Sequence, residues 1–192
     1  MNNKQILIDE YSEFYAQYYN IKSNSISGIP LKKNLHNNTM EYMIKIKNYI
    51  KNKNCKILEY GCATGFNLRY LQNEGYKNLI GIDGYKQFID VALTKEDNIN
   101  YQYINFSKTN NKMTSFGPIK YDFIFTRGTL QQGETQNEKI KNTDDDVKSI
   151  FYNFYNMLSE NGLVVICEGT VRNWIKLAEQ ANLTLLDGKN GN

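Results

Sequence analysis

The sequence predicts an α/β fold, in which helices cover both faces of a doubly wound, mostly parallel sheet in three layers. Three observations predict it. From residue 56 onward, short apolar runs of strand length alternate with segments whose apolar residues have helical spacing. Two of these runs end in an acidic residue close to glycine. The 192 residues, 41% of them hydrophobic, are enough for one domain with a sizeable core. Strands that alternate with helices pair in parallel through crossovers, so both faces become covered.

The strands and helices follow from this rhythm. Strands are predicted at residues 57–60, 79–82, 99–104, 121–125 and 163–167. Helices are predicted at residues 66–73, 86–94 and 147–158, the last with a complete apolar stripe. Thr143 is the predicted N-cap of that helix, because three aspartates follow where the helix dipole favours negative charge. Residues 183–186 would supply one further strand. Because few residues follow it, we expect the C-terminal strands of the sheet to be shortened.

The N-terminal part is predicted to consist of capping helices. Aromatic residues from Tyr11 to Tyr19 are spaced along one face of a helix, and a turn-rich stretch at 23–30 ends it. A second helix is predicted from about Asn38 to Asn52, with these residues facing inward: Met40, Met43, Ile44 and Ile50. We therefore divide the chain into capping helices at 1–52 and an α/β domain at 53–192.

Composition excludes several classes of protein. Asn, Lys, Ile and Tyr make up 82 of the 192 residues, and all four have AT-rich codons, so single residues of these types carry little weight. The net charge is only +3, with 3 Arg, which argues against a nucleic-acid-binding protein. Three cysteines without a Cys-x-x-Cys pair, and one histidine, argue against a metal site or a disulfide framework.

Membrane and export signals are not apparent in the sequence. No stretch approaches the 18 apolar residues of a membrane span. The apolar run within the first ten residues is too short for the core of a signal peptide. We therefore expect no membrane partner and a cytoplasmic location.

The loop after the first predicted strand is the most informative stretch. Glu59 ends that strand, and glycines follow at 61 and 65 before a helix. A dinucleotide fold would need G-x-G-x-x-G, but Ala63 and Phe66 stand where two of its glycines belong. The acidic-x-Gly-x-x-x-Gly pattern instead suits a ligand with a cationic amine and no pyrophosphate. A tight turn without a ligand is the alternative.

A second acidic residue ends the next predicted strand. Asp83, followed by Gly84, lies 22 residues after Gly61. This offset is close to the roughly 20 residues expected for an acid that binds ribose hydroxyls. An ordinary helix N-cap is the alternative for Asp83, and the two roles are compatible.

The order of these motifs resembles class I S-adenosylmethionine-dependent methyltransferases of the small-molecule type, across residues 56–168. The resemblance implies a Rossmann-like fold and S-adenosylmethionine as the cofactor. It implies that Glu59 stabilises the methionine amine and that Asp83 binds the ribose. The other cofactor-binding residues that it implies are Gly61, Cys62, Ala63, Gly65 and Gly84 in the loops, Asn105 and Phe106 at the adenine, and Thr126 and Arg127 at the fourth strand end.

The chain also departs from that family. Ala63 replaces a glycine that is frequent there, and Asn105 replaces an aspartate but keeps an oxygen that accepts a hydrogen bond. Gln131 and Gln132 stand where many relatives have histidine, so no imidazole base is expected there. The Asn-Pro-Pro-Tyr motif of methyltransferases that act on the amino groups of nucleobases is absent.

The resemblance implies an enzyme that transfers a methyl group to a small polar acceptor, which we expect to be methylated at oxygen. A surface-polysaccharide precursor is one such acceptor. A hydroxyl acceptor needs a base, and the candidates are His36, Glu168 and Glu134. Two alternatives stay open: a cofactor-binding module without turnover, and an RNA methyltransferase. The sequence predicts no oligomeric state.

Overall fold

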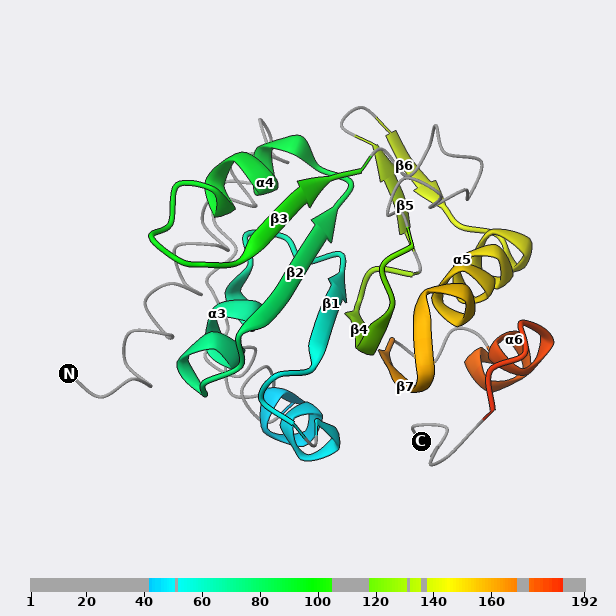
Figure 1. The fold of residues 1–192 in the computed structure, drawn as a ribbon. Helices are drawn as coiled ribbons and strands as arrows, with labels where there is room; N and C mark the ends of the chain where they lie inside the picture. Colours follow the sequence, from blue (N-terminus) through cyan, green and yellow to red (C-terminus); the bar gives the residue numbers. More distant parts are fainter. Residues whose placement is uncertain are drawn as a thin grey trace.

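The structure is a computed structural model that describes residues 42–50, 52–104, 118–130, 132–135, 138–168 and 173–184 (Figure 1). In these residues, five strands form one sheet in which every pairing is parallel, in the order β3–β2–β1–β4–β7. The strands are β1 at Lys56–Tyr60, β2 at Asn78–Asp83, β3 at Asn100–Tyr103, β4 at Tyr121–Arg127 and β7 at Leu158–Cys167. The predicted Rossmann-like α/β fold is confirmed.

The strand order decides where a ligand can bind. From β1 the chain builds the sheet outward through β2 and β3, and it then returns to place β4 on the other side of β1. In parallel sheets of this kind, ligands bind at the carboxyl ends of the strands where the order reverses. Tyr60 near the end of β1 is level with Ile82 on one side and Thr126 on the other. The strand-end residues predicted from the sequence therefore meet at one edge.

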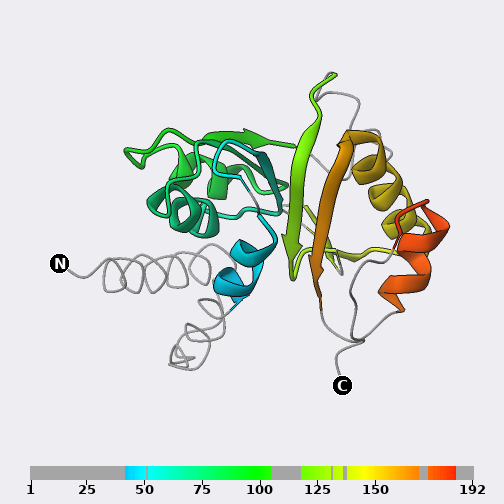
Figure 2. The same ribbon diagram turned by 60° about the horizontal axis from the view of Figure 1, so that its bottom comes forward.

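Helices cover both faces of the sheet, as Figures 1 and 2 show. They are α3 at Phe66–Asn73, α4 at Lys86–Ala92, α5 at Asp144–Met157 and α6 at Trp174–Gln180. In Figure 2, α5 and α6 lie on one side of the β4–β7 pair, and the helix at residues 42–49 lies on the other. The strands supply alternate residues to two buried apolar clusters: Ile57 and Phe125 pack with α3 and the 42–49 helix, whereas Leu58 and Ile124 pack with α5 and α6.

Most predicted elements are confirmed within a few residues. Helix α3 has the predicted bounds, and α5 begins after Thr143, whose side chain forms a capping box with Asp146. The 42–49 helix lies within the predicted second helix, and Met43 and Ile50 are buried as predicted. The inward position of Ile44 is wrong, because this side chain is 49% exposed while Ile46 is 1% exposed.

Several predictions in the N-terminal part lie outside the described residues. These are the Tyr11–Tyr19 stripe, Met40 and most of the capping region. The division at residue 52 therefore stays a prediction. In the described part of that region, Met43, Ile46 and Ile50 belong to the same apolar cluster as Ile57 of β1.

Two features were not predicted. An antiparallel hairpin of β5 at Gln132–Thr135 and β6 at Glu138–Lys141 follows β4, and α6 follows β7. The predicted strand at 183–186 is not seen in its described half, since Leu183 and Thr184 follow α6 without strand structure. Of the helices in the described ranges, none is long and apolar enough to cross a membrane.

Candidate functional site

The loop between β1 and α3 has an unusual backbone. Gly61, Ala63 and Gly65 all have positive φ, at 80°, 49° and 82°. Ala63 therefore adopts the left-handed conformation that glycine tolerates best. Backbone bonds fix the loop: the Gly61 and Cys62 amides donate to the Ile82 carbonyl at 2.8 and 2.9 Å, and the Gly65 amide donates to the Cys62 carbonyl at 2.8 Å.

Both glycines of this loop allow a close approach by a side chain. A Cβ at position 61 would collide with Thr129, and a Cβ at position 65 would collide with the Tyr101 ring. The side chain of Thr129 therefore packs in the space next to Gly61. Thr129 was missed because nothing in the sequence links residues 68 positions apart.

Glu59 is a buried carboxyl group with only one of its oxygens satisfied. The residue is 1% exposed, and its Oε1 accepts a hydrogen bond from Asn67 Nδ2 at 2.6 Å. Its Oε2 is buried and has no partner among the described residues. Burial raises the pKa of Glu59 to about 8, and the nearby Asp83 carboxylate adds to the increase. A buried carboxyl oxygen without a partner among the described residues suits a cationic ligand.

Asp83 connects the loop between β1 and α3 to the loop between β2 and α4. Its Oδ2 accepts from the Ala63 amide and its Oδ1 accepts from the Tyr85 amide, each at 2.8 Å. The residue is only 7% exposed. The alternative role of Asp83 as a helix N-cap is wrong, since Tyr85 is the N-cap residue of α4. Asp83 instead fixes the left-handed Ala63 at the carboxyl edge.

Glu168, directly after β7, holds the loop that follows β4. Its Oε1 accepts from the amides of Thr129 at 2.9 Å and Leu130 at 3.1 Å, and Thr126 Oγ1 lies 3.5 Å away. Its Oε2 is buried and lacks a partner among the described residues. Burial raises the pKa of Glu168, and the hydrogen bonds to its carboxylate oppose that increase.

Arg127 ends β4 and lies near Glu59. Because Glu59 is level with Phe125 in the sheet, Arg127 lies two residues further along and on the same face. The positive charge of Arg127 acts to lower the pKa of Glu59. Its guanidinium lies 5.3 Å from the centre of the Tyr42 ring, and the Tyr42 hydroxyl donates to the Thr126 carbonyl at 3.3 Å.

The structure therefore brings most of the predicted residues to one edge. Those that meet at the carboxyl ends of β1, β2, β4 and β7 are Glu59, Gly61, Cys62, Ala63, Gly65, Asp83, Thr126, Arg127 and Glu168. Gly84 follows Asp83 directly. His36, Asn105 and Phe106 lie outside the described residues, and only the backbone of Glu134 is described. In the part of the chain with described side chains, no three His, Cys, Asp or Glu residues are grouped to hold a metal ion.

Comparison with known proteins identifies the family. A family model described as a methyltransferase domain matches residues 51–187, which is more than two thirds of the chain. The chain belongs to this methyltransferase family. The prediction of a class I S-adenosylmethionine-dependent methyltransferase, with S-adenosylmethionine as cofactor, is confirmed.

Solved methyltransferase structures share the fold. A TehB-like methyltransferase from Corynebacterium glutamicum superposes with a TM-score of 0.58 at 18% identity, over 90% of this chain and 83% of that one. The PH0226 protein from Pyrococcus horikoshii superposes with a TM-score of 0.58 at 16% identity, over 78% of this chain and 64% of that one. CalS10, an amino pentose methyltransferase from Micromonospora echinaspora, was solved with S-adenosylmethionine bound. It superposes with a TM-score of 0.55 at 12% identity, over 81% of this chain and 56% of that one.

The chain thus spans under two thirds of the length of the last two proteins. No curated protein matches the sequence.

Proposed function

We propose that this methyltransferase transfers the methyl group of S-adenosylmethionine to an oxygen of a small polar acceptor. The observation that carries the cofactor-binding part of the proposal is the buried Glu59, whose Oε2 has no partner among the described residues, on the same sheet face as Arg127. The methionine half of the cofactor has an ammonium and a carboxylate. Glu59 would pair with the first and Arg127 with the second, so the charges of the site and of the ligand are complementary.

The remaining cofactor-binding residues follow the same edge of the sheet. The backbone of Gly61, Cys62 and Ala63 would line the methionine part of the cofactor. Gly65 would provide the tight turn from this loop into α3. The carboxylate of Asp83, with Gly84 beside it, would accept from the ribose hydroxyls. The predicted roles of Asn105 and Phe106 at the adenine stay proposals, and so does the contribution of Thr126.

The cofactor supplies an electrophilic methyl group, so the task of the protein is chiefly to position the acceptor. Glu168 is one proposed base for a hydroxyl acceptor, and His36 is the other. Two features of Glu168 support this role: its Oε2 is buried without a described partner, and burial raises its pKa, which makes the carboxylate a stronger base. Its Oε1 is engaged by backbone amides, which would keep Oε2 in place.

The class of acceptor is supported by analogy and by a missing motif. CalS10 methylates an amino pentose. The absence of the Asn-Pro-Pro-Tyr motif argues against nucleobase amines. We therefore propose a small polar metabolite, for example a sugar precursor of a surface polysaccharide. A cytoplasmic location is part of the same proposal.

Titration calorimetry with S-adenosylmethionine and S-adenosylhomocysteine tests the site. We expect the wild-type protein to bind both, and Asp83→Ala to lose about tenfold or more in affinity, because the ribose loses its acceptor and Ala63 loses its anchor. Asp90→Asn, which changes an exposed carboxylate on α4, is the matched control and should bind normally. Equal binding by Asp83→Ala and the wild type would contradict the proposal.

A panel of hydroxylated small molecules then tests the transfer itself, with Glu168→Gln as the variant expected to lose rate. Tight cofactor binding without transfer to any acceptor would instead favour a binding module without turnover.

A further inference from the structure

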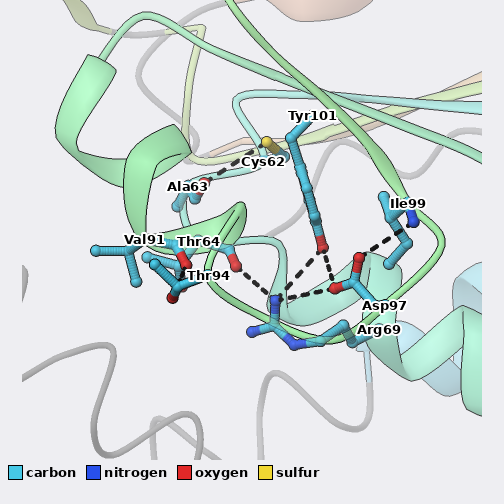
Figure 3. Close-up of polar contacts among 9 residues, drawn as sticks. All are labelled: Cys62, Ala63, Thr64, Arg69, Val91, Thr94, Asp97, Ile99 and Tyr101. Atoms are coloured by element: carbon cyan, nitrogen blue, oxygen red, sulfur yellow. Dashed lines mark hydrogen bonds and ion pairs between the residues drawn. The ribbon is translucent and has the colours of Figure 1, made fainter.

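A buried ion-pair network lies against the loop at residues 61–65, between β1 and α3 (Figure 3). Arg69 comes from α3, Asp97 from the turn before β3, and Tyr101 from β3 itself. The side chains of Arg69 and Asp97 expose 9% and 6% of their surface, and Arg69 Nη1 lies 3.7 Å from Asp97 Oδ2. The Tyr101 hydroxyl donates to the same Oδ2 at 3.0 Å, and the Ile99 amide donates to Oδ1 at 3.1 Å. Both oxygens of Asp97 are thus engaged.

The network contacts the loop at two adjacent residues. Arg69 Nη1 donates to the Thr64 carbonyl at 2.7 Å, and the Tyr101 ring packs where a Cβ of residue 65 would be. Thr64 lies between Ala63 and Gly65, both of which have a left-handed backbone. The contacts therefore fall beside Ala63, a non-glycine residue held in the left-handed conformation.

Stability alone is a poor explanation for these charges. A buried ion pair contributes little more than well-packed apolar residues would, because desolvation offsets the attraction. Here the same guanidinium also reaches a backbone carbonyl of the loop, which apolar residues could not do. Its position beside the loop therefore indicates a role in fixing the backbone.

We propose that Arg69, Asp97 and Tyr101 are positioning residues for cofactor binding. Asp97 and Tyr101 orient the guanidinium of Arg69, and Arg69 holds the Thr64 carbonyl, so that residues 61–65 keep the backbone that receives the methionine half of the cofactor. None of the three needs to touch the cofactor. This inference rests on the proposed binding site, and it adds a link between that loop and β3 at the sheet edge.

The double variant Arg69→Met/Asp97→Asn tests the inference, because it removes both charges together and leaves no unpaired buried ion. We expect it to fold with an unchanged circular dichroism spectrum. Its affinity for S-adenosylhomocysteine should fall about tenfold or more, as is typical when the support of a binding group is lost. In the free protein, the Gly65 amide should exchange its hydrogen faster, whereas amides of β1 such as that of Leu58 should not.

The control is Lys148→Met/Asp145→Asn, which removes an exposed ion pair from α5, on the face of the sheet opposite to α3. It should leave both the affinity and the exchange of Gly65 unchanged. Should the first double variant fail to fold, Tyr101→Phe decides: it removes only the hydroxyl that orients Asp97, and it should weaken binding in the same direction but less.

A folded variant that binds like the wild type, with unchanged exchange at Gly65, would overturn the inference. Failure of the wild type to bind S-adenosylhomocysteine would instead contradict the proposed function. The exchange of Gly65 would still report on the network in that case, so the two failures are distinguishable.

Discussion

Glu59 is the residue whose chemistry depends most on its surroundings. Burial raises its pKa to about 8, so at pH 7 the free protein holds this carboxyl group largely protonated. A bound ammonium group would favour the charged carboxylate and lower that pKa. Cofactor binding at pH 7 should therefore release up to about one proton, and above pH 9, where Glu59 is already ionised, this release should vanish.

Calorimetry of S-adenosylhomocysteine binding in buffers of different ionisation enthalpy measures that proton. Glu59→Gln keeps the size of the side chain but cannot titrate, so it should bind more weakly and release no proton from this site. Proton release of the same size in Glu59→Gln and the wild type would show that another group titrates.

Single residues differ in how far the sequence predicts them. The place of Glu59 and Asp83 at the sheet edge could be predicted because an acidic residue at the end of an apolar strand is visible in the sequence, and parallel strands end at one edge. Thr129 and Arg69 were not found, because their roles come from contacts with Gly61 and Thr64 that only the folded chain creates.

Among the elements, α5 has the clearest start. Thr143 Oγ1 accepts from the Asp146 amide at 3.2 Å, and Asp146 Oδ2 accepts from the Thr143 amide at 2.8 Å. Thr143→Ala should lower the free energy of unfolding by about 1 kcal/mol, the usual effect of losing an N-cap. Urea denaturation measures it. Ser149→Ala, which removes an exposed bond to the Asp145 carbonyl on the same helix, should change stability by less than about 0.5 kcal/mol.

Elements were predicted where an apolar pattern is dense and were missed where it is sparse. The stripe of α5 packs on the sheet through Val147, Phe151 and Phe154, so the pattern reports the packing directly. The β5–β6 hairpin contains mostly polar residues in sequence, and among the described residues its two strands pair only with each other, so it leaves no such pattern. Ile44 was misplaced because helix phase, not hydrophobicity alone, decides which residue faces the core.

At the scale of the whole molecule, the site is assembled from the ends of strands that also form the core. The alternate residues of β1 and β4 reach both apolar clusters, while their last residues reach the carboxyl edge. A ligand at that edge binds the folded state and not the unfolded state, so it should stabilise the whole domain against unfolding. At a concentration 100 times its dissociation constant, S-adenosylhomocysteine should add about 2.7 kcal/mol.

For a domain of this size that gain corresponds to a rise in Tm of about 5–10 °C, measurable by differential scanning calorimetry. Methionine alone lacks the ribose that Asp83 is proposed to bind, so at the same concentration it should raise the Tm far less. Asp83→Ala should lose about half of the shift or more, because a ligand that binds about tenfold more weakly is then present at only about 10 times its dissociation constant. A full shift in Asp83→Ala would mean that the ligand is held elsewhere, since the energy of binding and the rise in Tm are two measures of the same equilibrium.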